Sequence, residues 1–112
     1  VNFALQFEGN PYVYGGTSLT NGADCSGFVM SVFANFGYSL PRVAAAQCDA
    51  STKKDISQLE PGDLVFYGNG YIDHVALYIG DGKIIHASNA ATGIKISDYD
   101  YEQPAAVGTF ME

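Results

Sequence analysis

A cysteine and two histidines are the residues of this sequence best suited to chemistry. Cys25 lies in the segment 22–37, which is expected to form one helix because Asp24 can cap its start and Gly37 can end it in a left-handed conformation. The helix face that begins at Cys25 continues through Val29, Val32 and Phe36. The thiol is therefore expected at the N-terminal end of the buried face. Because the first turn of a helix carries partial positive charge, we expect the thiolate, the nucleophilic form, to be favoured there.

A free cysteine is more often a small core residue than a nucleophile, so its role depends on a nearby base. His74 and His86 lie on two expected strands, 74–79 and 83–88, joined by the segment 80–82. A two-residue turn at Asp81-Gly82 would place the histidines on opposite faces of this hairpin. A three-residue loop would place His86 opposite Ala76 and both imidazoles on one face, and it also leaves a continuous apolar surface on the other face. We therefore expect the three-residue loop.

On one face, the two imidazoles would form a catalytic group with the thiol. His74 would take the proton of Cys25, and His86 would hold the far nitrogen of the His74 ring. A metal site made of these same three side chains is an alternative, but the sequence offers no evident fourth ligand. We therefore expect no metal and no cofactor.

Length and composition place narrow limits on the class of protein. The chain has 112 residues, of which 47% are hydrophobic and 15% charged, as expected for one globular domain. A net charge of −7 gives no electrostatic reason for binding nucleic acid or an anionic membrane surface, and no apolar run is long enough to span a bilayer. Because the chain starts at Val1 with no signal peptide, we expect residues 1–112 to be a single catalytic domain taken from a longer secreted protein.

The second cysteine lacks the features that make Cys25 interesting. No capping aspartate precedes Cys48, and the spacing of the two cysteines matches no common zinc motif. We expect Cys48 to be structural, with a Cys25–Cys48 disulfide in an oxidising compartment as the alternative.

The order of the other elements predicts an α+β fold. A short helix within 1–9 is followed by a tight aromatic turn at 11–16, where Tyr14 is expected to be a core residue, and by an alanine-rich helix at 43–50. Further strands are expected at 64–67, 94–97 and 105–110. Helices first and antiparallel strands later are typical of α+β domains.

Five segments together resemble the NlpC/P60 cysteine peptidases. They are 11–16 (PYVYGG), 24–29 (DCSGFV), 40–42 (LPR) with Gln47, 59–66 (LEPGDLVF), and 74–80 (HVALYIG) with 85–87 (IHA). The resemblance implies a papain-like α+β fold in which the helix bearing the cysteine packs on an antiparallel sheet. It also implies hydrolysis of bacterial cell-wall stem peptides, usually between D-γ-glutamyl and a diamino acid, either meso-diaminopimelate or L-lysine.

The resemblance also implies roles for individual residues. By position, Cys25 matches the nucleophile, His74 the base and His86 the third polar residue. The positions that match the family's oxyanion or substrate contacts are Tyr12 beside the cysteine, Asp24 and Ser26 at the L-alanine end of the substrate, and Arg42 and Gln47 along the groove. The partner would be a peptidoglycan stem peptide, and the domain would act outside the cytoplasm as a monomer.

Two other functions remain open on the same scaffold. An N-acetylmuramoyl-L-alanine amidase would use the same cysteine and histidine but cut between the sugar and L-alanine. A non-catalytic wall-binding domain would need neither, and the presence of Cys25, His74 and His86 argues against it.

Overall fold

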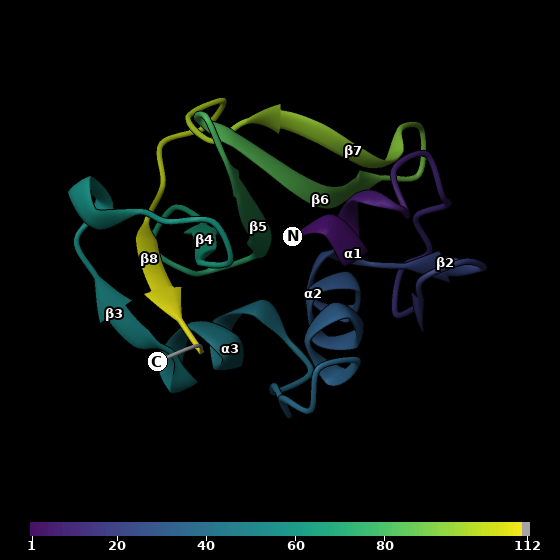
Figure 1. The fold of residues 1–112 in the computed structure, drawn as a ribbon, viewed down its shortest axis with the longest axis horizontal. Coiled ribbons are helices and arrows are strands. Elements are labelled where there is room, and N and C mark those ends of the chain that lie inside the picture. Colours follow the sequence, from purple (N-terminus) through teal and green to yellow (C-terminus); the bar gives the residue numbers. More distant parts are fainter. Residues whose placement is uncertain (111–112) are drawn as a thin grey trace.

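Short helices occupy the first half of the chain in the computed structural model, which describes residues 1–110 (Figure 1). They are α1 (Asn2–Leu5), α2 (Cys25–Ala34) and α3 (Ala44–Ala50), followed by a 3₁₀ turn at Ile56–Gln58. All three α-helices lie within the segments expected from the sequence. In the part of the chain described, no helix has the length and apolar character needed to cross a membrane.

A six-stranded antiparallel sheet makes up most of the second half. Its strands are β3 (Thr52–Lys54), β4 (Leu64–Tyr67), β5 (His74–Gly80), β6 (Lys83–Asn89), β7 (Gly93–Asp98) and β8 (Ala106–Thr109). They follow the order β3-β8-β4-β5-β6-β7, so the last strand in the sequence lies between β3 and β4. A small separate ribbon pairs β1 (Thr17–Ser18) with β2 (Gly22–Ala23). The α+β prediction is confirmed, whereas β1, β2 and β3 were not expected from the sequence.

Local signals fix both ends of α2. The Asp24 carboxylate accepts the backbone N–H of Gly27 at 2.7 Å, as an N-cap should. At the other end Gly37 has φ of 87°, and the N–H of Tyr38 bonds to the carbonyl of Phe33, which closes the helix as a Schellman motif. The expected position of Phe36 on the buried face is wrong, because α2 ends at Ala34 and the Phe36 side chain is 58% exposed.

The buried face of α2 packs against one face of the sheet. Phe28, Val29, Val32 and Phe33 are buried there with Val75, Leu77 and Ile85 of the central strands. The other face carries a second, smaller core of Val65, Tyr67, Ala76 and Ile84. Strand β4 is buried on both faces, which explains why its four residues are all apolar or aromatic. The sheet thus gives α2 a rigid platform, with Cys25 at the end of the helix.

The hairpin of β5 and β6 differs from its predicted form in an instructive way. Its turn has two residues, Asp81 and Gly82, with φ of 55° and 75°, and Gly80 pairs with Lys83. The predicted three-residue loop is therefore wrong. However, a β-bulge between Tyr78 and Gly80 inserts one extra residue and restores the predicted register, with Leu77 opposite Ile85. His74 and His86 consequently share one face of the sheet.

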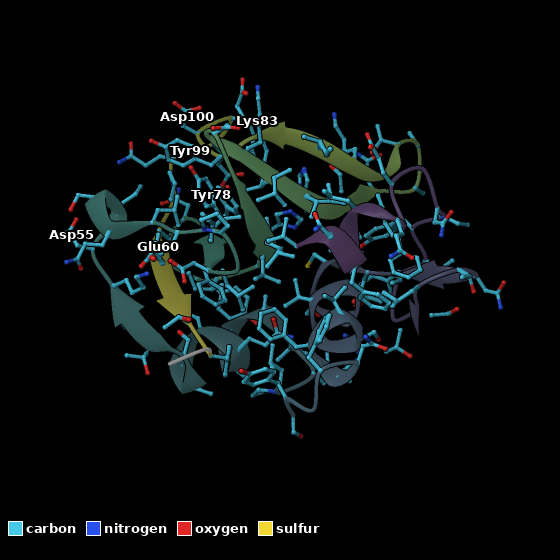
Figure 2. All side chains as sticks on the ribbon, viewed as in Figure 1. Asp55, Glu60, Tyr78, Lys83, Tyr99 and Asp100 are labelled. Carbon is cyan, nitrogen blue, oxygen red and sulfur yellow. The ribbon has the colours of Figure 1, made fainter. Side chains whose placement is uncertain are left out.

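The segment 99–105, which connects β7 to β8, covers this same face. Figure 2 shows Tyr99 close to Tyr78 at the far end of the hairpin, and their rings lie edge to face with centroids 6.2 Å apart. The Tyr67 hydroxyl donates to the carbonyl of Tyr99 at 2.6 Å. These contacts tie the connecting segment down over the histidine-bearing strands.

Candidate active site

A groove of about 540 Å³ opens at the N-terminal end of α2. Cys25 lies in its wall, and four of the residues predicted to bind substrate line it as well: Tyr12, Asp24, Ser26 and Arg42. The groove is completed by the loop before β5, which contributes Tyr71 and Asp73. The structure therefore brings these predicted residues together around one thiol, although they come from three different segments of the chain.

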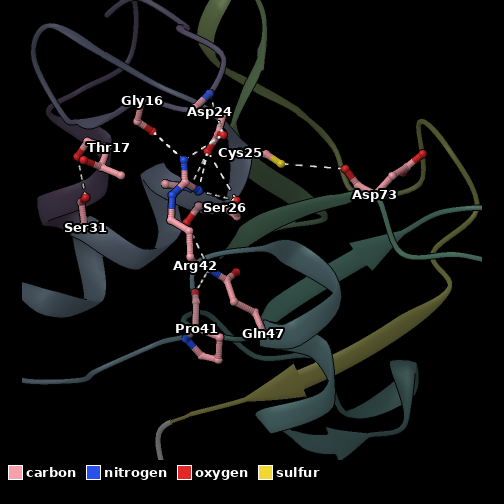
Figure 3. A network of polar contacts seen from close by, with 12 residues as sticks. Gly16, Thr17, Asp24, Cys25, Ser26, Ser31, Pro41, Arg42, Gln47 and Asp73 are labelled. Carbon is pink, nitrogen blue, oxygen red and sulfur yellow. Dashed lines mark hydrogen bonds and ion pairs between the residues drawn. The ribbon is translucent and has the colours of Figure 1, made fainter.

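Asp24 and Arg42 form the main ion pair of the groove (Figure 3). The Arg42 guanidinium donates a hydrogen bond to each carboxylate oxygen of Asp24, with N–O distances of 3.1 and 3.0 Å. It also donates to the Ser26 hydroxyl at 3.0 Å. Burial by itself would raise the pKa of Asp24. The hydrogen bonds from Arg42 and from the Gly27 N–H outweigh it, so the pKa of Asp24 lies below its ordinary value. Asp24 is therefore an ionised cap whose charge is already balanced.

The thiol of Cys25 is held against the start of β5. Its sulfur lies 4.0 Å from the carbonyl oxygen of Asp73, within hydrogen-bonding reach for an S–H donor. Burial raises the pKa of the Cys25 thiol and is stronger than the opposing effect of the backbone N–H groups of Val75 and Ser26. The expectation that the helix N-terminus favours a resting thiolate is therefore wrong, because desolvation dominates. Near neutral pH the Cys25 thiol therefore keeps its proton.

The two histidines are in direct contact on the sheet. His74 Nε2 lies 2.7 Å from His86 Nδ1, and His86 Nε2 lies 3.0 Å from the hydroxyl of Ser97 on β7. Burial lowers the pKa of His74 to about 4 and that of His86 to about 3. Both rings are therefore neutral near pH 7, and the predicted pairing of the two imidazoles is confirmed.

This chain of contacts restricts where the ring protons can be. Only one proton fits between His74 Nε2 and His86 Nδ1, and His86 Nε2 can donate its proton to the Ser97 hydroxyl. With His86 protonated on Nε2, its Nδ1 accepts from His74 Nε2–H, and Nδ1 of His74 is left free. The contact with Ser97, whose hydroxyl can accept, is thus compatible with the tautomer in which His74 can take up a proton.

Ser97 and two tyrosines are site residues that the sequence did not reveal. The Tyr67 ring lies 5.8 Å from that of His74, the Tyr101 ring lies 5.4 Å from that of His86, and the two tyrosine rings are 5.2 Å apart. They exclude water from the imidazole pair, and this desolvation accounts for the low pKa values of both histidines. Only the register of β6 on β7 and the path of the segment 99–105 reveal these neighbours.

Two residues lie elsewhere than predicted. Gln47 is fully buried and does not line the groove; its amide instead donates to the carbonyls of Ser26 and Pro41, at 3.1 and 2.9 Å. It ties the first turn of α2 to the segment that carries Arg42 (Figure 3). Tyr14 is not a core residue, because it is 89% exposed at the rim of the groove.

Cys48 is buried, as expected for a structural cysteine. Both cysteines are free thiols, so the alternative Cys25–Cys48 disulfide is absent.

Known proteins resemble this chain along most of its length. It is 41% identical over 99 residues to the bifunctional muramidase/DL-endopeptidase CwlT of Bacillus subtilis, covering 85% of this chain and 30% of that protein. It is 43% identical over 94 residues to the gamma-D-glutamyl-L-lysine dipeptidyl-peptidase of the same organism, covering 80% of this chain and 31% of the relative. The chain therefore spans about a third of the length of these curated relatives.

A solved structure shares the fold. The crystal structure of an NlpC/P60 family protein from Bacillus cereus superposes with a TM-score of 0.93 at 33% identity, over 99% of this chain and 39% of that one. Residues 9–109 also match the NlpC/P60 family as a whole. This match covers the groove, both histidines and every strand of the sheet. The chain belongs to the NlpC/P60 family.

Proposed function

We propose that this domain hydrolyses peptidoglycan by cutting stem peptides between D-γ-glutamyl and a diamino acid, with Cys25 as nucleophile. The observation that carries the proposal is the free thiol of Cys25 in the groove, in contact with Asp73, the residue directly before His74, where the His74–His86–Ser97 chain of contacts begins. The names of the two relatives, a DL-endopeptidase and a gamma-D-glutamyl-L-lysine dipeptidyl-peptidase, support this choice of bond. Such a substrate would be met outside the cytoplasm.

The mechanism is acyl transfer assisted by a neutral base. The stem peptide lies in the groove with its scissile carbonyl at the Cys25 sulfur. Nδ1 of His74 takes the thiol proton as the sulfur attacks, because neither group is ionised beforehand. His74 then gives this proton to the leaving amine of the diamino acid. Water, activated by the same imidazole, hydrolyses the thioester and restores the thiol.

Charge develops on the carbonyl oxygen during attack, and Tyr12, which lines the same groove as Cys25, would stabilise it. Burial, together with the nearby Cys25 and Asp24, raises the pKa of the Tyr12 phenol, so Tyr12 keeps its proton and can donate it in a hydrogen bond. The backbone N–H of Cys25, in the first turn of α2, is the second donor. Arg42 and Ser26 keep Asp24 in place at the end of the groove that receives the L-alanyl part of the stem.

Digestion of purified peptidoglycan tests the proposal. Mass spectrometry of the released fragments should show L-alanyl-D-glutamate ends on one side and a free α-amino group on the diamino acid on the other. Cys25→Ala should release nothing, while Cys48→Ala, a matched substitution at the buried thiol, should keep the activity. Release of whole stem peptides would instead identify an amidase. Binding without cleavage by the intact Cys25 protein would identify a wall-binding domain.

A further inference from the structure

Two carboxylates line the groove, and they differ in how their charges are balanced. Asp24 accepts five hydrogen bonds: two from Arg42, one each from the N–H groups of Gly27 and Gly15, and a longer one from the Ser26 hydroxyl. This oxygen pair has little capacity left for another cation. The Asp24 end of the groove is therefore close to neutral.

Asp73 lies on the other side of the sulfur and is not balanced in this way. Its carbonyl faces Cys25, while its side chain turns away from Arg42 and Asp24 (Figure 3). The side chain is exposed, and within residues 1–110 no lysine, arginine or histidine forms an ion pair with it. The negative charge of Asp73 nevertheless acts on two neighbouring rings, because it contributes to raising the pKa values of His74 and Tyr101.

No basic side chain of the groove compensates this charge. Arg42 lines the groove but is committed to Asp24. Lys95, whose charge acts on His86, lies opposite His86 on β7 and is not among the residues that line the groove. Of the two carboxylates that line the groove, Asp73 is therefore the one whose charge no ion pair balances.

We propose that Asp73 binds the side-chain ammonium of the diamino acid and makes the domain select L-lysine over meso-diaminopimelate. The inference rests on the proposed function, in which the L-alanyl part lies at Asp24 and the leaving diamino acid lies at the opposite end. Lysine ends in a single ammonium group on a flexible four-carbon stem. Meso-diaminopimelate ends in an ammonium and a carboxylate, and that carboxylate would meet Asp73 with no cation to accept it.

Two synthetic tripeptides, L-Ala-γ-D-Glu-L-Lys and L-Ala-γ-D-Glu-meso-diaminopimelate, test this selectivity. Because an exposed ion pair and a like-charge contact are each modest, we expect kcat/KM to favour the lysine peptide by about three- to tenfold. Asp73→Asn keeps the shape of the side chain and removes its charge. It should bring the ratio of the two kcat/KM values to within about twofold, mainly by raising KM for the lysine peptide.

Asp81→Asn is the matched control, because it removes the same charge from the exposed turn of β5 and β6, where a positive φ suits asparagine. It should leave the ratio unchanged, and Asp73→Glu should keep the preference for lysine. A general effect of Asp73 on His74 would lower both kcat values equally and leave the ratio intact, which would overturn the inference. Equal cleavage of both peptides by the unmodified protein would also overturn it while leaving the proposed function standing. Cleavage of neither peptide would overturn both.

Discussion

Replacing Ser97 by alanine probes the proton arrangement of the site without touching the groove. The Ser97 hydroxyl is 3.0 Å from Nε2 of His86, and His86 is only 1% exposed. Removal of this partner leaves a buried N–H unsatisfied, which costs about 1–3 kcal/mol. His86 can escape this penalty by moving its proton to Nδ1. His74 must then carry its own proton on Nδ1, where it can no longer act as a base.

The expected result is a fall in kcat of roughly 5- to 150-fold, the range that corresponds to this penalty. KM should change little, since Ser97 does not line the groove. Turnover of L-Ala-γ-D-Glu-L-Lys measures both constants, and ¹⁵N NMR of the imidazoles reports the tautomer of each ring. Ser97→Thr keeps a hydroxyl and should retain most of the activity, while Ser57→Ala, on the exposed 3₁₀ turn, is the control.

Two results would refute the reasoning. An unchanged kcat in Ser97→Ala would mean that the hydroxyl does not govern the tautomer. A large rise in KM with kcat preserved would mean that Ser97 acts on substrate binding and not through the histidines.

Three further predictions concern pH and stability. The acid limb of kcat/KM should lie near pH 4, well below the ordinary pKa of histidine, because His74 stays neutral down to about 4; an acid limb near pH 6.5 would contradict the burial argument. The same shift makes stability depend on pH: the folded pKa of His74 lies below the unfolded value of 6.5, so its contribution is complete above pH 6.5 and is lost as the pH falls towards 4. Urea denaturation should show up to about 3 kcal/mol of this loss from His74, and His74→Gln should remove that part while the part that comes from His86 remains. Lys54→Met should destabilise the fold by roughly 3 kcal/mol, because it leaves the Asp63 side chain, 5% exposed with its carboxylate 2.6 Å from Lys54, without its cation. Lys83→Met, which removes the exposed pair with Asp98, should cost less than about 1 kcal/mol in the same assay.

Local signals in the sequence determined the elements of this fold. A capping aspartate and a left-handed glycine set the position of α2, and runs of apolar residues between glycine-rich turns set β4, β5 and β6. Such signals act over a few residues and survive any tertiary arrangement. The shared face of His74 and His86 was also predictable, since the alternation of polar and apolar side chains selects it. The detail of the turn was not, because Asp-Gly favours a two-residue turn and the bulge at Ile79 is what restores the alternation.

Contacts between distant segments were decided by the tertiary structure alone. Nothing near Ser97 in the sequence marks it as a partner of His86, because their contact depends on how β7 pairs with β6. The resemblance places both Arg42 and Gln47 along the groove, and only the fold shows that Arg42 pairs with Asp24 and that Gln47 is buried.

Tertiary structure also set the charge state of the Cys25 thiol. The sequence places the thiol of Cys25 at a helix N-terminus, which favours a thiolate. Burial beneath the loop before β5 has the larger effect and keeps the proton on the sulfur. Sequence determines which groups are present and how each lies on its own helix or strand. Packing determines how much water each group loses, and that loss sets the pKa values on which the proposed chemistry depends.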